Sequence, residues 1–178
     1  MHLEEVNKIL EEHKLWLASN KEEGKIANFQ KANLREFNLQ HAFLQEAIFY
    51  WADLQGANLQ EAHLQGAKLQ GAMLQRADLQ GANLKWATLQ RAKLQKANLQ
   101  RANLQRANLQ EANLRKADLR EAQLQGAGLI AANIMGANLD QANFEGANLN
   151  SIIIDKASAS NLPKSIIERY GSTFLVSE

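Results

Sequence analysis

The chain has 178 residues, a formal net charge of +1 and no cysteine. This length suits one domain of ordinary size. The balanced charge argues against an acidic mimic of nucleic acid and against a strongly basic nucleic-acid binder, and the lack of thiols excludes disulfides and cysteine catalysis. No apolar run reaches the roughly 18 residues of a membrane span, and the first residues are too acidic for a signal peptide. We therefore expect a cytoplasmic protein that makes no contact with a membrane.

Residues 3–19 have the spacing of an amphipathic helix. Apolar residues recur at helical intervals on one face, namely Leu3, Val6, Ile9, Leu10, Trp16 and Leu17. A polar linker follows and ends at Gly24. We assign residues 1–24 as a capping helix and linker for the segment that follows, because the first unit of a repetitive fold needs a cover. Binding of a partner by this helix is the alternative.

The next part of the chain repeats every five residues. Alanine occupies every fifth position from Ala27 to Ala147 except for Phe37, and Leu, Phe or Ile occupies every fifth position from Phe29 to Ile154. A continuous helix would spread these leucines around its circumference, because five residues advance the chain by about 140°. A continuous strand would send successive Ala–Leu pairs to opposite faces, because five is odd. A chain that turns a corner once per repeat keeps all of them inside, which predicts stacked coils with strand-like sides.

The repeating unit, A-(N/D)-L-x-x, resembles that of the pentapeptide repeat family, as "ANLQR", "ADLQG" and "ANLQG" illustrate. The resemblance covers most of the chain. It implies an all-β solenoid, a right-handed quadrilateral β-helix of pentapeptide repeats with four sides and about 20 residues per coil. About six coils would then occupy residues 25–154. Side chains 20 residues apart should stack, so Phe29 and Phe49 should lie in one column.

Asn or Asp usually precedes the central leucine of a unit, as Asn28, Asn33 and Asp53 do. Short polar side chains bond to nearby backbone groups and stabilise corners. We therefore interpret these residues as structural, and the glutamines that follow the leucines as exposed ladders without chemistry.

No constellation of residues points to catalysis. The histidines lack the spacing of metal ligands. They are His2, His13, His41 and His63. The chain contains no nucleophile elbow and no phosphate-binding glycine loop within a strand-to-helix unit. We therefore expect a non-enzyme that holds no metal and no cofactor.

The segment "FLQEAIFYWADL", residues 43–54, breaks the polar pattern of the outward positions. Exposed aromatic clusters mark interaction sites. With another ring further along the chain, the outward residues form a candidate protein-interaction patch, namely Phe43, Ile48, Tyr50, Trp51 and Trp86. The alternative is that the N-terminal segment covers these side chains.

Basic residues are concentrated between positions 85 and 116. Stacking at 20-residue intervals pairs Arg91 with Glu111 and Arg101 with Glu121, which predicts ion pairs between coils. One column is uniformly positive and forms a candidate anion site, namely Arg76, Lys96 and Lys116. A phosphate or an acidic partner could bind there, but we favour a solvated face, and nucleic acid is not an expected partner.

The five-residue pattern decays near the C-terminus. Pro163 suits the first turn of a short helix and Gly171 suits its end. We assign residues 155–178 as a C-terminal cap or tail. Members of the resembled family dimerise through their C-terminal coils, and this end has apolar residues to spare because three consecutive isoleucines cannot all point inward. A homodimer would use the candidate contact residues Ile152, Ile153, Phe174 and Leu175.

The pattern defines a shape more clearly than an activity. We predict a non-enzymatic scaffold, a rigid β-helical rod that binds an unidentified protein partner. The resemblance offers an alternative, because some pentapeptide repeat proteins imitate the DNA duplex and bind DNA gyrase. Those rods are markedly acidic, whereas residues 27–154 carry 13 Lys and Arg against 10 Asp and Glu. The near-neutral surface disfavours this alternative. Repeats of this kind are common in bacteria, and in cyanobacteria especially.

Overall fold

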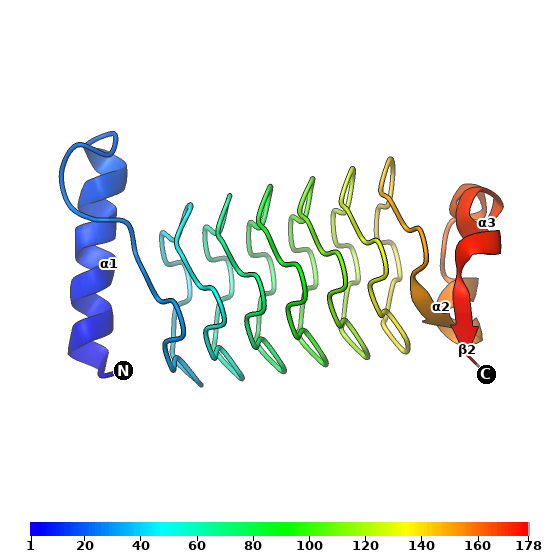
Figure 1. Ribbon diagram of the computed structural model, residues 1–178, viewed down its shortest axis with the longest axis horizontal. Coiled ribbons are helices and arrows are strands. Elements are labelled where there is room, and N and C mark those ends of the chain that lie inside the picture. The colour runs from blue at the N-terminus through cyan, green and yellow to red at the C-terminus, as the bar shows by residue number, and fades with distance from the viewer. Residues whose placement is uncertain (178) are drawn as a thin grey trace.

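The computed structural model describes residues 1–177. It is an elongated stack of coils with helices at both ends (Figure 1). The named helices and strands lie at these two ends. They are α1 (Leu3–Ala18), β1 (Ile153–Asp155), α2 (Lys156–Ser160), α3 (Lys164–Tyr170), a 3-10 helix (Gly171–Thr173) and β2 (Leu175–Ser177).

Each coil has four sides. Isolated parallel bridges join residues 20 apart along the whole stack, from Asn28 with Ile48 to Asn133 with Ile153. This register matches the stacking inferred from the five-residue repeat. We name the sides A, B, C and D in chain order, and their first central residues are Phe29, Leu34, Leu39 and Leu44. The corners AB, BC, CD and DA follow these sides and begin with Lys31, Glu36, His41 and Glu46.

The geometry of the corner explains why the unit has five residues. The second residue after each leucine takes a left-handed φ, even where it is not glycine, as at Arg101 with +55°. The next N–H then turns back, so that Ala102 donates to the Leu99 carbonyl at 3.0 Å. The Oδ1 of Asn98 accepts the N–H of Gln100 at 3.2 Å, and the same contact recurs at the Asn and Asp of many other units. These contacts confirm that the short polar residues stabilise the corners.

The interior consists of the leucine and alanine columns. Every central residue from Phe29 to Ile154 is buried, and so is every alanine of the series from Ala47 to Ala147. Phe29 and Phe49 stack with their ring centroids 5.1 Å apart, which confirms the expected column on side A. Burial of each leucine stabilises the fold by about 1.5–3 kcal/mol, and neighbouring coils provide the surface that buries it.

Helix α1 lies beside the first coil (Figure 1). Its buried side chains are Val6 and His13, which are seven residues apart and therefore on one face. The linker then passes close to the helix at Gly24, where a Cβ would overlap the Glu12 carbonyl oxygen. The inner position expected for Leu3 is wrong: this side chain is 62% exposed, because it stands in the first turn at the free end of the helix.

The C-terminal tail packs on the last coil. Strand β2 pairs in parallel with β1, so that Ile153 lies opposite Leu175. Ile152 and Ile154 point into the core while Ile153 is half-buried, which confirms that the three isoleucines cannot all face inward. Helix α3 lies between Pro163 and the 3-10 helix, where the sequence predicted a short helix.

Polar contacts hold the tail in place. The Asp155 carboxylate accepts the N–H of Ser158 at 2.7 Å and the N–H of Gly136 at 2.5 Å. These backbone donors hold the pKa of Asp155 below its usual range. The Tyr170 hydroxyl donates to the Ala147 carbonyl at 3.0 Å. Helix α2, which Asp155 begins, was not predicted.

Candidate interaction surfaces

Trp51 stands on corner AB and lies over Gly71, the next residue of that column. A Cβ at Gly71 would overlap the indole atoms Cε3 and Cζ3, so the ring occupies the space that glycine leaves. Trp51 is 56% exposed, whereas Gly71 is buried. The indole is therefore supported by backbone while much of its surface faces solvent. A groove of about 310 Å³ continues from this ring along corner AB to the pair Arg91 and Glu111.

Side A separates two exposed tryptophans. Its outward residues Ile48 and Tyr50 are half-buried and adjoin Trp51. Trp86 stands on corner DA, at the opposite edge of the same side, and is 52% exposed. The Nζ of Lys85 lies 4.4 Å from the centroid of the Trp86 ring. Four of the five candidate patch residues thus border or occupy side A.

The fifth, Phe43, belongs elsewhere. Its bridge partner is His63, which places both residues on side D, and their rings stack at 4.9 Å. Corner DA, on which Trp86 stands two coils further along, separates Phe43 from Ile48, Tyr50 and Trp51, so the candidate patch is divided. None of the three exposed rings is covered by α1, since Phe43, Trp51 and Trp86 are all about half exposed.

Both predicted ion pairs between coils are present. Arg91 Nε lies 2.7 Å from Glu111 Oε2 on corner AB, and Arg101 Nε lies 2.9 Å from Glu121 Oε2 on corner CD. The arginine side chains lower the pKa of both glutamates by hydrogen bonding and by charge. The pairs are exposed, which is typical of contacts that add little stability.

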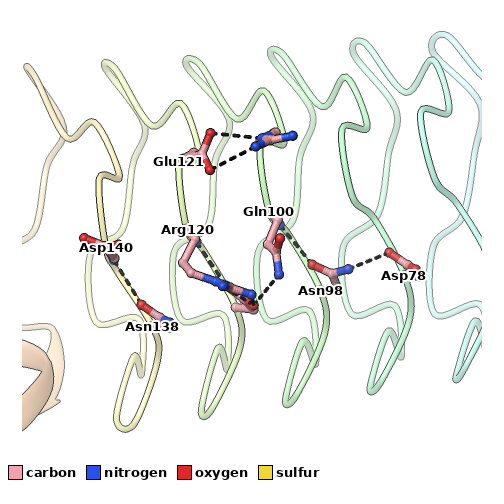
Figure 2. A network of polar contacts seen from close by, with 9 residues as sticks. Asp78, Asn98, Gln100, Arg120, Glu121, Asn138 and Asp140 are labelled. Carbon is pink, nitrogen blue, oxygen red and sulfur yellow. Dashed lines mark hydrogen bonds and ion pairs between the residues drawn. The ribbon is translucent and has the colours of Figure 1, made fainter.

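Side C carries a polar network (Figure 2). The Asp118 carboxylate accepts hydrogen bonds from Arg120 and Gln100, and Arg120 holds the pKa of Asp118 below its usual range. The Asp78 carboxylate accepts from Asn98 at 3.0 Å and from Gln60. Many glutamines predicted as exposed ladders are half-buried instead, and two of them, Gln60 and Gln100, donate to aspartates of the neighbouring coil.

The candidate anion column is on corner BC. The backbone register places Arg76, Lys96 and Lys116 on consecutive coils, and all three side chains are exposed. Gly136 follows Lys116 in the same column.

The candidate dimer residues divide between interior and surface. Ile152 is fully buried in the core, so it is not available for contact with a second chain, and its assignment to a dimer contact is wrong. The cause is that Ile152 occupies the small-residue position of its unit, which points inward. Ile153 and Phe174 are half-buried, and Leu175 is 58% exposed.

His13 is the residue whose role the sequence reasoning missed. It is completely buried, its Nδ1 accepts the Ala27 N–H at 3.1 Å, and its ring stacks with Trp16 at 5.5 Å. Burial lowers the pKa of His13. The available signal was its position seven residues after Val6, on the apolar face of the helix.

Within residues 1–177, no group of three or more His, Asp or Glu side chains is arranged to hold a metal ion. The same part of the chain contains no helix with the length and apolar character of a membrane span.

The sequence matches the family model for pentapeptide repeats in eight copies, over residues 27–60, 47–85, 82–120, 97–134 and 112–150. A search of curated proteins finds no match. Among solved structures, the chain is similar to the pentapeptide repeat protein Rfr23 from the cyanobacterium Cyanothece 51142. The identity is 29% over 70% of this chain and 84% of that chain, with a TM-score of 0.49.

Two further solved structures show the range of relatives. HetL from the cyanobacterium Nostoc sp. strain PCC 7120, a pentapeptide repeat protein involved in heterocyst differentiation regulation, is 33% identical over 71% of this chain and 76% of that chain, with a TM-score of 0.33. Full-length QnrB1, a plasmid-mediated fluoroquinolone resistance protein, is 19% identical over 84% of this chain and 75% of that chain, with a TM-score of 0.52. The likeness to QnrB1 is one of fold alone.

Proposed function

We propose that this protein is a non-enzymatic scaffold in the cytoplasm. The chain belongs to the pentapeptide repeat family, and such chains fold as right-handed β-helices. The rod presents side A and its two bordering corners to a protein partner. The residues proposed to meet the partner are Ile48, Tyr50, Trp51 and Trp86.

The observation that carries this proposal is the support of Trp51 by Gly71. An exposed tryptophan is usually mobile, and ordering it on binding costs entropy. Here the backbone of the next coil already holds the ring in one place. Rigid, exposed aromatic side chains are the commonest anchors of protein interfaces, since they bury a large area at a low entropic cost.

The two ends of the rod have a structural role in this proposal. Helix α1 caps the first of about six coils, and α2, α3 and β2 cap the last, so that the open ends of the solenoid do not aggregate. A homodimer through the C-terminal end would use Ile153, Phe174 and Leu175, and light scattering of wild type beside Leu175→Asp tests it. A shift to half the mass in the variant supports this contact, and an unchanged mass rejects it.

Gyrase binding is the alternative. It has the support of the shared fold with QnrB1, which at 19% identity concerns the fold alone. The surface charge opposes it, because corner BC is positive over three coils and the acids at Glu111 and Glu121 are paired with arginines.

The experiment compares three immobilised proteins in lysate from the source cells: wild type, a Trp51→Ala, Trp86→Ala double variant, and Lys96→Ala as a matched change at exposed corner BC, which does not border side A. Each captured protein is then purified and titrated against all three. We expect one partner that binds wild type and Lys96→Ala equally and the double variant at least about tenfold more weakly. Equal binding of a purified partner to all three would refute the role of side A. Capture of gyrase subunits by all three would favour the alternative.

A further inference from the structure

Corner BC differs from its neighbours in how it stacks charge. On corners AB and CD, an arginine is followed 20 residues later by a glutamate that pairs with it. On corner BC, three cations follow one another, namely Arg76, Lys96 and Lys116. Like charges directly opposite each other on neighbouring strands are destabilising. The column therefore carries a repulsion that the other corners avoid.

The backbone brings these cations onto consecutive coils. The N–H of Arg76 donates to the Gln95 carbonyl at 3.1 Å, and the N–H of Lys96 donates to the Arg115 carbonyl at 3.0 Å. Adjacent coils in such a ladder lie about 4.8 Å apart, so the three positive side chains begin within about 10 Å of one another. Arg115, which precedes Lys116, adds a fourth charge at the same end.

Two carboxylates of side C, which adjoins the column, are already bonded elsewhere. Asp78 and Asp118 lie on the adjoining side C, where Asp78 accepts from Asn98 (Figure 2) and from Gln60. Asp118 accepts from Arg120 and Gln100 (Figure 2). Among the ion pairs of residues 1–177, none involves a cation of the column. Along corner BC, acidic side chains occur only beyond the two ends of the column. Glu36 precedes it, and Asp155 lies near Gly136, which follows it.

A groove of about 460 Å³ adjoins the N-terminal part of the column, at Arg76 and Lys96. The Glu36 side chain lies over Gly56, with its Cγ 3.4 Å from where a Cβ of Gly56 would stand, and it is the one carboxylate among the lining residues. Glutamine amides line the groove beside the cations and can donate hydrogen bonds to an anion. The lining residues are Arg35, Glu36, Gln55, Gly56, Gln75, Arg76, Gln95 and Lys96.

We propose that corner BC binds a condensed phosphate chain, whose closely spaced negative charges match a row of cations one coil apart. A ligand with bases is disfavoured, because binding of single-stranded nucleic acid relies on aromatic stacking platforms. The exposed tryptophans stand on corners AB and DA, and no aromatic side chain lines this groove. The inference does not depend on the protein partner proposed for side A.

The test uses Lys96→Glu, which replaces the middle cation by an acid between Arg76 and Lys116. The matched control is Arg106→Glu, the same charge reversal at corner DA, where Gly126 follows. Thermal unfolding is followed with and without sodium tripolyphosphate at low salt. We expect the ligand to raise the Tm of wild type and of Arg106→Glu, and to leave Lys96→Glu unchanged. Without ligand, Lys96→Glu should unfold about 1–3 °C above wild type, because it converts repulsion into pairing.

Titration by calorimetry gives the affinity. We expect tripolyphosphate to bind Lys96→Glu at least about tenfold more weakly than wild type, with a binding constant that falls steeply as salt rises. The proposal is overturned if wild type shows no binding at about 10 mM ligand, or if Arg106→Glu weakens binding as much as Lys96→Glu does. It is also overturned if a thymidine oligonucleotide binds more tightly than a polyphosphate of equal charge, since corner BC would then be a nucleic-acid surface.

Discussion

The buried Nδ1 of His13 accepts the N–H of Ala27, and this contact joins α1 to the first alanine of the repeat. The acceptor exists only while the imidazole is neutral, because a protonated ring carries a hydrogen on both nitrogens. Protonation would place an N–H at His13 Nδ1 against the N–H of Ala27, so that two donors face each other. It would also bury a positive charge. The attachment of α1 to the coils is therefore sensitive to pH.

The first prediction follows from the pKa of His13, which burial lowers. A group whose pKa is lowered on folding stabilises the folded state fully above its unfolded pKa, about 6.5, and loses that stabilisation as the pH falls below it. We expect α1 to detach increasingly as the pH is lowered below about 6.5, with a loss of at most about 1.4 kcal/mol per pH unit. The backbone of Gln45 and the charge of Glu46, which Lys21 pairs, oppose this lowering of the pKa.

Hydrogen exchange of the α1 amides at several pH values measures this detachment. His13→Asn is the control, because its Oδ1 can accept the Ala27 N–H but does not titrate. An identical pH profile in the variant would show that another group is responsible.

The second prediction concerns Gly71. In Gly71→Ala the new methyl group occupies the position of the Trp51 indole, so the ring must move out. Gly81→Ala is the matched control, because Gly81 has the same positive φ but only the flexible Glu61 side chain above it. Both variants should lose about 1 kcal/mol from the left-handed backbone, and Gly71→Ala about 1–2 kcal/mol more from the displaced ring. Urea unfolding measures the difference, and tryptophan fluorescence should change in Gly71→Ala alone.

The third prediction tests the close packing of the interior. Leu99 is buried in the middle of the stack, in the leucine column of side C, with Leu79 and Leu119 on the neighbouring coils. Leu99→Ala should therefore lower the free energy of unfolding by about 2–5 kcal/mol. Arg106→Ala, at an exposed corner, should stay within about 0.5 kcal/mol of wild type. A loss below 1 kcal/mol for Leu99→Ala would mean that the coil collapses around the missing side chain.

The fourth prediction addresses the corner hydrogen bond. Asn103 Oδ1 accepts the Gln105 N–H at 3.0 Å. Asn103→Ala leaves this partly buried donor without its partner and should cost about 1 kcal/mol in unfolding free energy. Asn103→Asp keeps an acceptor in the same place and should cost less. Equal losses in the two variants would locate the effect in the side-chain amide rather than in the acceptor.

The coils could be predicted from sequence because nearly every unit points its alanine and its leucine inward. A separation of 20 residues directly predicted the stacking of Phe29 on Phe49 and the ion pair of Arg91 with Glu111. The division of the aromatic patch did not. Phe43 and Trp51 are eight residues apart, and only the assignment of sides shows that a corner separates Phe43 from side A.

The two ends could be predicted only in part, because they lack the repeat. His13 was overlooked since a polar residue on an amphipathic helix is ordinarily placed outward, and its burial depends on one N–H of the first coil. Ile152 was assigned to the surface although it stands at the small-residue position of the last unit, five residues after Ala147, where its side chain is buried. Helix α2 begins where the Asp155 carboxylate accepts the Ser158 N–H. No periodic pattern predicts this contact.

The uniformity of the coils has a consequence for how the chain finds its fold. The stretch "ANLQRANLQRANLQEANL" would fill the interior equally well if it were shifted along the stack by one coil, since every Ala and Leu would land on another Ala or Leu. The middle of the protein therefore contains little information about its own position. That information resides in features that occur once, such as the stacked rings of Phe29 and Phe49 and the contact of His13 with Ala27. Removal of these N-terminal features should leave a chain that still coils but begins at the wrong residue.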